Sequence, residues 1–176
     1  MALKISALRA AAYRSDRVSV PKTLGEAILS KTQTAFLCHS HKDKELAKGL
    51  QVILKEQGWD LYIDWQDNEM PATPNRETAK RIKDKIEITD WFLFLATVNS
   101  TSSRWCPWEI GFADAKKSYE KIVMIPTEDA NGNWHGNEYL QLYKNLSDAS
   151  NSSTKKSGYA VFEAASKKSG TWVELL

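Results

Sequence analysis

The sequence predicts an α/β protein in which a mostly parallel β-sheet is flanked by helices. From residue 34 onward, short apolar runs alternate with longer amphipathic segments, a pattern typical of strand–helix units in a parallel sheet. The chain has 176 residues, and a single domain of this size buries roughly 70% of the surface that its unfolded form exposes. We therefore expect one domain at 34–176 and an N-terminal extension at 1–33, whose role the sequence leaves open.

The first strand–helix unit is predicted at 34–58. The segment TAFLCHS at 34–40 is apolar enough for a buried strand, and 41–58 repeats leucine and isoleucine at helical spacing. Gly58 stands where it can end this helix in the left-handed conformation, which glycine adopts without steric cost. The turn from strand to helix is then at 40–43.

A second strand and helix follow on either side of a loop that contains two prolines. WDLYIDW at 59–65 alternates as a strand, whereas the polar segment QDNEMPATPN at 66–75 cannot continue it. Thr73 is placed to cap the next helix and Pro74 to open it, which predicts a helix at 77–90.

The third and fourth strands are predicted to be joined by a helix. WFLFLAT at 91–97 is apolar on both faces and predicts a central strand. FADAKKSYEK at 112–121 completes the helix, and KIVMIPT at 121–127 predicts a fourth strand that stops at Pro126.

The C-terminal region is predicted to begin with another helix. NEYLQLYKNL at 137–146 brings its apolar residues to one helical face. SDASNSSTKKSG at 147–158 predicts a weakly ordered loop, because its residues are almost all small or polar. The tail at 159–176 is expected to form an edge hairpin or to add one last strand.

Composition and charge exclude several classes of partner. The formal net charge is +2, with acids and bases mixed along the chain, so no nucleic acid and no membrane partner are predicted. No apolar stretch approaches the roughly 20 residues of a membrane span, and the first residues lack the apolar core of a secretory signal. Cys38 and Cys106 are too few for a disulfide framework, which suits a reducing compartment, so a cytoplasmic location is expected.

Three groups of residues follow the predicted strands. In an open parallel sheet, ligands bind beyond the carboxyl ends of the strands, where loops and helix N-termini converge. That edge collects 38–42 after the first strand, 64–67 after the second and 97–109 after the third. We therefore expect these three groups to share one cleft.

Three motifs along the chain resemble those of one family. FLCHSHKD at 36–43 resembles a first-strand box with its Ser-x-x-Asp, GWDLYIDW at 58–65 a second-strand box, and SRWCPWEIG at 103–111 a Trp-Cys-x-x-Glu box. With these motifs in the family's order and spacing, the chain resembles a bacterial TIR (Toll/interleukin-1 receptor) domain over roughly 34–147. The resemblance implies a flavodoxin-like open parallel sheet of about five strands flanked by helices.

The resemblance also implies an enzyme that acts on NAD+. In NAD-cleaving members the glutamate of the third box is the catalytic residue, and the matching residue here is Glu109. The implied activity is that of an NAD+ nucleosidase or ADP-ribosyl cyclase, with NAD+ as substrate and no cofactor or metal. Similar stand-alone enzymes serve Thoeris-type antiphage defence, in which a nucleotide product reaches a separate effector protein. Self-association through TIR–TIR contacts is a further property that the family implies.

The chemistry of this bond cleavage suits a single carboxylate. Nicotinamide leaves as a neutral base and needs no proton, and the transition state resembles an oxocarbenium ion. Glu109 is predicted in the first turns of a helix capped by Ser102 or Ser103, where the helix dipole favours its ionised form. Of the two indoles beside it, Trp105 is the preferred substrate contact and Trp108 the preferred packing residue.

Further substrate-binding residues are predicted after the first two strands. His39 and Ser40 are expected to line the cleft, with Lys42 or backbone N–H groups facing the NAD+ diphosphate at the helix start. Asp64 and Trp65 complete the predicted substrate-binding set. The alternative is that Ser40 only caps the helix and that the histidines are solvated.

A zinc site is disfavoured, although the segment at 38–41 reads Cys-His-x-His. Neighbouring residues on a strand point to opposite faces, and no fourth ligand of convincing spacing follows. A phosphoacceptor response regulator is also disfavoured, because its third strand should end in an aspartate and this strand ends in FLAT.

Two other functions stay open at this point. A non-catalytic TIR adaptor would act only through TIR–TIR contacts and would need no carboxylate in the third box, so Glu109 counts against it. A nucleoside-processing transferase of related architecture would act on deoxynucleosides instead of NAD+.

Overall fold

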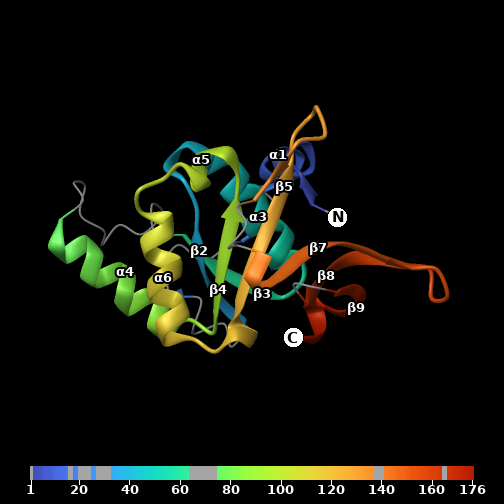
Figure 1. Cartoon of the computed structure of the whole chain (residues 1–176). Helices are drawn as coiled ribbons and strands as arrows, with labels where there is room; N and C mark the ends of the chain where they lie inside the picture. The colour runs from blue at the N-terminus through green and yellow to red at the C-terminus, as the bar shows by residue number, and fades with distance from the viewer. Residues whose placement is uncertain are drawn as a thin grey trace.

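The computed structural model describes residues 2–15, 18–19, 25–26, 33–63, 75–136, 141–163 and 166–176 (Figure 1). The strands are β1 (Leu3–Lys4), β2 (Gln33–Cys38), β3 (Trp59–Tyr62), β4 (Trp91–Ala96), β5 (Ile122–Glu128), β6 (Trp134–His135), β7 (Lys144–Asn151), β8 (Lys156–Glu163) and β9 (Ser166–Trp172). The α-helices are α1 (Ile5–Ala12), α3 (Lys44–Glu56), α4 (Arg76–Ile88), α5 (Val98–Thr101) and α6 (Cys106–Lys116). Short 3-10 helices are η2 (His41–Asp43), η4 (Tyr119–Lys121) and η6 (Val173–Leu175).

The predicted open, mostly parallel sheet is confirmed. Within the described ranges the sheet has nine strands, and its main path runs β3-β2-β4-β5-β7-β8-β9. The first five strands of that path pair in parallel, in the flavodoxin-like order, whereas β8 and β9 join in the antiparallel sense. The sheet therefore has more strands than expected, because β8 and β9 extend one edge in the antiparallel sense and β1 and β6 pair with the end of β5.

The first unit forms as predicted. The strand β2 is buried along nearly its whole length, and α3 turns its leucine and isoleucine stripe inward. Gly58 follows the helix with φ of 87°, the left-handed conformation expected of a glycine at that place.

The helix α4 begins at a different cap from the one predicted. Asn75 is its N-cap: the Asn75 side chain accepts from Thr78 N at 3.0 Å, and the Thr78 hydroxyl accepts from Asn75 N at 3.1 Å. This reciprocal pair is a capping box, which satisfies two backbone N–H groups at once. The predicted cap at Thr73 is therefore wrong, and Thr73 and Pro74 lie outside the described residues.

The strand β5 does not stop at Pro126. Pro126 pairs in register with Ala96, the last residue of β4, and β5 then continues to Glu128. Beyond the proline, Thr127 and Glu128 pair with β1 on one side and with β6 on the other. Proline has no backbone N–H to donate to a neighbouring strand. The sheet nevertheless continues past Pro126, because the next two residues of β5 pair with β1 and β6.

The C-terminal prediction of a helix at 137–146 and a loose loop at 147–158 is wrong over the described residues from 141 onward, and 137–140 lie outside them. Residues 144–151 and 156–163 form β7 and β8, which pair as an antiparallel hairpin from Asn145 opposite Phe162 to Asn151 opposite Lys156. On the predicted helical face, Leu142 is 65% exposed, whereas Leu146 is buried between strands. The last strand, β9, pairs with β8, so the predicted C-terminal edge hairpin is confirmed.

The N-terminal segment forms part of the sheet and of one helical layer. The strand β1 pairs in parallel with the end of β5, and α1 packs against α3. A Cβ atom added to Gly49 of α3 would lie 1.9 Å from the Leu8 carbonyl oxygen of α1. The two helices approach this closely because Gly49 has no side chain.

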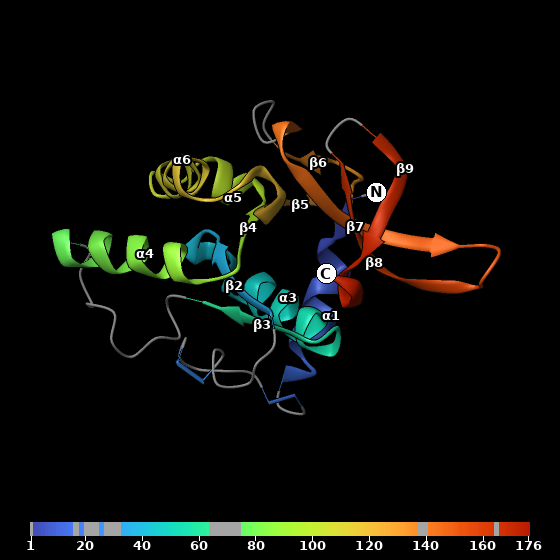
Figure 2. The ribbon, with the colours of Figure 1, turned by 90° about the horizontal axis from the view of Figure 1, so that it is seen from below.

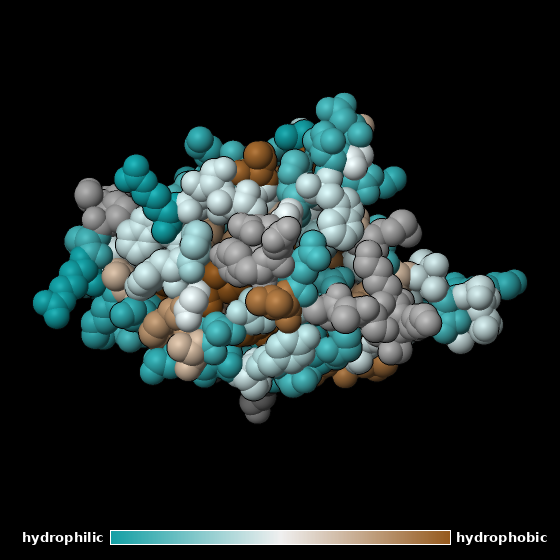
Figure 3. Space-filling model, in the orientation of Figure 1, coloured by the Kyte–Doolittle hydropathy of each residue, from teal (hydrophilic) through white to brown (hydrophobic). Residues whose placement is uncertain are grey.

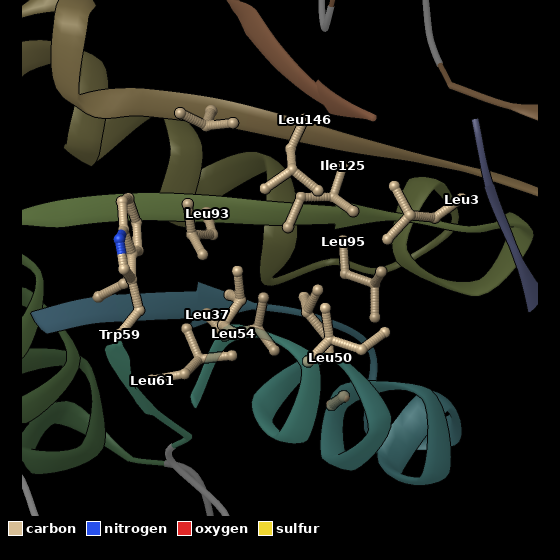
Figure 4. Close-up of a cluster of buried hydrophobic side chains, with 14 of the residues drawn as sticks. Leu3, Leu37, Leu50, Leu54, Trp59, Leu61, Leu93, Leu95, Ile125 and Leu146 are labelled. Atoms are coloured by element: carbon tan, nitrogen blue, oxygen red, sulfur yellow. The ribbon is translucent and has the colours of Figure 1, made fainter. Parts of the chain in front are cut away.

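Helices cover both faces of the sheet and bury two apolar clusters (Figures 1 and 2). On one face, α1 and α3 pack over residues such as Leu37, Leu93 and Ile125, and Figure 4 shows Leu50 and Leu54 of α3 against these strand residues. On the other face, α4 and α6 pack over Phe36 and Phe92, whose rings stack with centroids 5.9 Å apart. Alternating side chains of each strand thus enter different clusters.

The surface seen in Figure 3 is mostly hydrophilic, with hydrophobic atoms in separate small patches. None of the described helices has both the length and the apolar character needed to cross a bilayer.

Candidate active site

Glu109 lies on the inward face of α6, in its first turn. The buried residues of this helix are Cys106, Glu109, Ile110 and Ala113, which follow the i, i+3, i+4, i+7 spacing of one helical face. Glu109 is 6% exposed, and its neighbours on that face belong to the apolar cluster under α4 and α6. A carboxylate at such a position is costly to bury, so it marks a candidate functional residue.

The start of α6 favours an ionised carboxylate. Pro107 stands in the first turn, where its missing N–H costs no hydrogen bond, and Glu109 N donates to Trp105 O at 2.9 Å. The positive end of the helix dipole therefore lies beside the Glu109 side chain.

Neither predicted serine is the N-cap of α6: the N-cap is Trp105, which makes no side-chain cap hydrogen bond, so the predicted cap at Ser102 or Ser103 is wrong. The Ser103 hydroxyl oxygen accepts from Trp105 N at 3.2 Å and from Cys106 N at 3.4 Å. Ser102 instead donates its hydroxyl to Val98 O at 2.9 Å, at the end of α5. The Ser103 oxygen thus forms a local side-chain turn that leads into α6, because it binds the backbone N–H groups of the N-cap and of the first helical residue.

Two buried thiols adjoin Glu109. Cys38, at the end of β2, and Cys106 are both 0% exposed, and Cys38 Sγ lies 3.8 Å from Cys106 O. Burial raises the pKa of the Cys38 thiol well above its usual value, and the side chains of Cys106 and Glu109 act in the same direction. The Cys38 thiol therefore stays protonated beside the carboxylate.

We expect both thiols to resist modification in the native protein. Ellman's reagent at pH 8 should react at least about 100-fold more slowly with the folded chain than with the chain unfolded in guanidinium, because labelling requires an opening reaction. The measurement is the absorbance of the released thiolate over time. Rapid release of one equivalent from the folded protein would contradict the buried placement of Cys38 and Cys106.

Asp43 joins the loops that follow β2 and β4. Its carboxylate accepts from the Thr97 hydroxyl at 2.6 Å and from Asn99 Nδ2 at 2.7 Å, and the residue is 5% exposed. Sequence reasoning assigned no role to Asp43, although it is the aspartate of the Ser-x-x-Asp motif. The motif was the signal that could have identified it.

The predicted residues after β2 form the turn into η2. His39 and Ser40 are buried, and the Ser40 hydroxyl oxygen accepts from Lys42 N at 3.3 Å, so Ser40 caps this turn. His39 Nδ1 donates to Leu37 O at 3.1 Å, because a carbonyl oxygen can only accept. The Lys42 side chain is exposed. Asp64 and Trp65 lie outside the described residues.

The two indoles beside Glu109 contact one another. Trp105 and Trp108 are half-buried, with ring centroids 5.5 Å apart and ring planes at 90°. Trp108 also stacks on Phe112 at 6.4 Å, and Lys83 Nζ lies 5.5 Å from the Trp108 ring centroid. Trp108 is therefore held by α4 and by its own helix, whereas Trp105 contacts the Trp108 ring edge-on.

A small cavity of about 170 Å³ lies at the opposite end of the sheet. It is lined by Trp91, the first residue of β4, and by Lys144, which forms ion pairs with Glu120 and Glu163. Because β4 runs from Trp91 toward α5, this cavity is remote from Glu109. Within the described ranges, no three His, Cys, Asp or Glu side chains gather closely enough to hold a metal ion.

Comparisons with known proteins point to one family. A family model described as a TIR domain matches residues 35–156, most of the chain. The chain is 29% identical over 116 residues to the probable 3' cyclic ADP-D-ribose synthase ThsB' of Bacillus cereus (strain MSX-D12). This match covers 65% of the chain and 60% of that relative, so the chain spans less than two thirds of the relative's length.

Proposed function

This chain belongs to the TIR domain family, and we propose that it cleaves the bond between nicotinamide and ribose in NAD+. The proposed products are nicotinamide and an ADP-ribose nucleotide. The relative's name includes cyclic ADP-D-ribose, which favours a cyclic product over a linear one. The enzyme is then an ADP-ribosyl cyclase, or an NAD+ nucleosidase if water captures the sugar.

The buried carboxylate of Glu109 is the observation that carries this proposal. It sits in the first turn of α6, beyond the carboxyl end of β4, where a ligand of an open parallel sheet binds (Figure 1). In the reaction, the bond from the ribose C1 to nicotinamide breaks and its electron pair neutralises the pyridinium nitrogen. Positive charge then develops on the sugar, and Glu109 stabilises it electrostatically while holding the ribose hydroxyls.

The second half of the reaction needs an acceptor for the sugar cation. An oxygen of water, or a nucleophilic atom at the other end of the same nucleotide, forms the new bond to C1. A hydroxyl that attacks also loses a proton, for which the Glu109 carboxylate is the nearest base in this proposal. A site that excludes water from C1 gives the cyclic product.

The remaining predicted residues take substrate-binding roles in the proposal. Trp105 is half-buried at the start of α6, which supports a ring contact with nicotinamide or ribose. The turn at 39–42 presents the exposed Lys42 for the diphosphate, with His39 and Ser40 beneath it. Asp64 and Trp65, after β3, remain proposed contacts to the rest of the nucleotide.

The proposed biological role is signalling. As the resemblance implies, the nucleotide product would reach a separate effector protein in the cytoplasm during antiphage defence, and copies of the chain would associate through TIR–TIR contacts. These partners follow from the family alone.

The test is to incubate the purified full chain with NAD+ and to identify all products by liquid chromatography and mass spectrometry. We expect one nicotinamide for each NAD+ consumed and a nucleotide whose mass is that of ADP-ribose less one water. ADP-ribose itself would identify a nucleosidase instead. No nicotinamide at any protein concentration would contradict the proposal and favour a non-catalytic adaptor, and turnover of deoxynucleosides alone would favour a transferase.

A further inference from the structure

A continuous line of hydrogen bonds leads from the η2 turn to the helix that carries Glu109. Its first member is Asp43, whose two carboxylate oxygens are each bound by a side chain of the β4–α5 turn, Thr97 at 2.6 Å and Asn99 at 2.7 Å. A buried carboxylate is stable only when its oxygens are bound, and charge-assisted bonds of this length are among the stronger ones in proteins. The turn after β4 is therefore fastened to the turn after β2.

Thr97 connects Asp43 to the first turn of α5 through its hydroxyl group. Its hydroxyl oxygen accepts from Ser100 N at 3.0 Å while its proton goes to Asp43, and the Ser100 hydroxyl oxygen accepts from Thr97 N at 2.8 Å. This is a capping box in which the cap hydroxyl also has a partner outside the helix. Its position is thus set by Asp43 and not by α5 alone.

Ser100 and Ser103 extend the line to α6. Ser103 N donates to Ser100 O at 3.1 Å, and the Ser103 hydroxyl oxygen accepts from Trp105 N and Cys106 N. Trp105 O in turn accepts from Glu109 N at 2.9 Å. Each step is local, yet together they connect the loop after β2 to the backbone of Glu109.

We propose that Asp43, Thr97, Ser100 and Ser103 are positioning residues that set the place of the Glu109 carboxylate relative to the bound substrate. The inference rests on the proposed NAD+ cleavage by Glu109. Hydrogen bonds are directional, so they restrict the position of a helix start more than apolar contacts do. Apolar side chains can slide past one another at little cost. Catalysis is sensitive to such a shift, because a displacement of about 1 Å in a reacting group can cost about 100-fold in rate.

The sharpest test compares Thr97→Val with Thr97→Ser. Valine keeps the shape of threonine but cannot bind Asp43 or cap α5, whereas serine keeps the hydroxyl. We expect Thr97→Val to lower kcat for NAD+ cleavage by about 10-fold to 100-fold with KM nearly unchanged. Thr97→Ser should recover most of the wild-type kcat, which a purely space-filling role of Thr97 would not explain.

A matched control lies in the same turn. Among the described residues, the Thr101 hydroxyl donates only to carbonyl oxygens of its own turn, Thr97 O at 3.0 Å and Val98 O at 3.2 Å, and takes no part in the side-chain bonds that run from Asp43 to Ser103. Thr101→Val should keep the wild-type kcat. A second variant, Ser103→Ala, acts at the other end of the line on a half-buried residue, and it should lower kcat in the same sense even if Thr97→Val fails to fold.

The outcomes separate this inference from the proposed function. Suppose that the wild-type protein turns over NAD+ and that Glu109→Gln does not. If Ser103→Ala and any folded Thr97→Val then keep the full kcat, the positioning role is wrong and the proposed function stands. A rise in KM without loss of kcat would also overturn it, since that result indicates substrate binding. If the wild-type protein itself has no turnover, the proposed NAD+ cleavage is wrong, and the positioning role that rests on it is wrong as well.

Discussion

Replacing Glu109 with glutamine should abolish measurable NAD+ cleavage while leaving the protein folded. The glutamine keeps the size of the side chain but removes the negative charge that faces the developing sugar cation. Loss of one such electrostatic contact costs about 100-fold to 1,000-fold in kcat, and the carboxylate that faces the reacting sugar belongs at the upper end, about 4 kcal/mol. Nicotinamide release at saturating NAD+ is the measurement.

The fold should survive this change because glutamine adds no charge and no volume to the inner face of α6. The lost interaction with the helix dipole is worth about 0.3–1 kcal/mol, a small part of the stability of a domain. Glu56→Gln is a suitable control, since Glu56 lies in an exposed ion pair with Arg14 at the far end of α3. Full turnover by folded Glu109→Gln protein would refute the catalytic assignment.

Replacing Gly49 with alanine should produce the largest loss of stability. The new Cβ atom would meet the Leu8 carbonyl oxygen at 1.9 Å, and this neighbour is backbone that cannot rotate away. Overpacking of this kind typically costs about 1–3 kcal/mol, which lowers Tm by roughly 3–10 °C in a chain of this size. Thermal and denaturant unfolding followed by circular dichroism measure it.

Gly111 provides the matched glycine. It lies within α6, and an added Cβ atom there meets nothing within 4 Å. Gly111→Ala should therefore leave Tm unchanged or raise it, since alanine gains about 0.5–1 kcal/mol over glycine in a helix interior. Equal stability of Gly49→Ala and wild-type protein would mean that α1 does not pack on Gly49 in solution.

The β–α part of the fold could be predicted because its signals are local. Apolar runs such as 91–97 and the leucine spacing of α3 reflect which faces are buried, and Gly58 marks a helix end by its backbone freedom. The helix predicted at 137–146 failed because a short apolar period fits a helix face and a strand equally well. Pairing of β7 with β5 and β8 decided that segment, and this pairing is not visible in the local pattern.

The sequence predicted the central carboxylate of the candidate site but not the contacts of the residues that surround it. Glu109 was predicted through its spacing within one short motif, and the structure buries it on the inner face of α6, whereas the predicted cap at Ser102 or Ser103 is wrong because Trp105 is the N-cap. The sequence placed Cys38 among the residues expected at the cleft but gave no role to it or to Asp43, because their partners Cys106 and Thr97 stand more than fifty residues away in the sequence. Only the parallel pairing of β2 with β4 brings those residues together.

The amino-acid sequence by itself determined the alternation of strands and helices from β2 to β5, the family motifs and the carboxylate at the start of α6. These depend on residue types and spacings along one stretch of chain. The tertiary structure alone decided which side chains face Glu109 and how its helix is fastened to the turn after β2. Such contacts depend on strand pairing and helix packing, whose free energy comes from residues that the sequence keeps far apart.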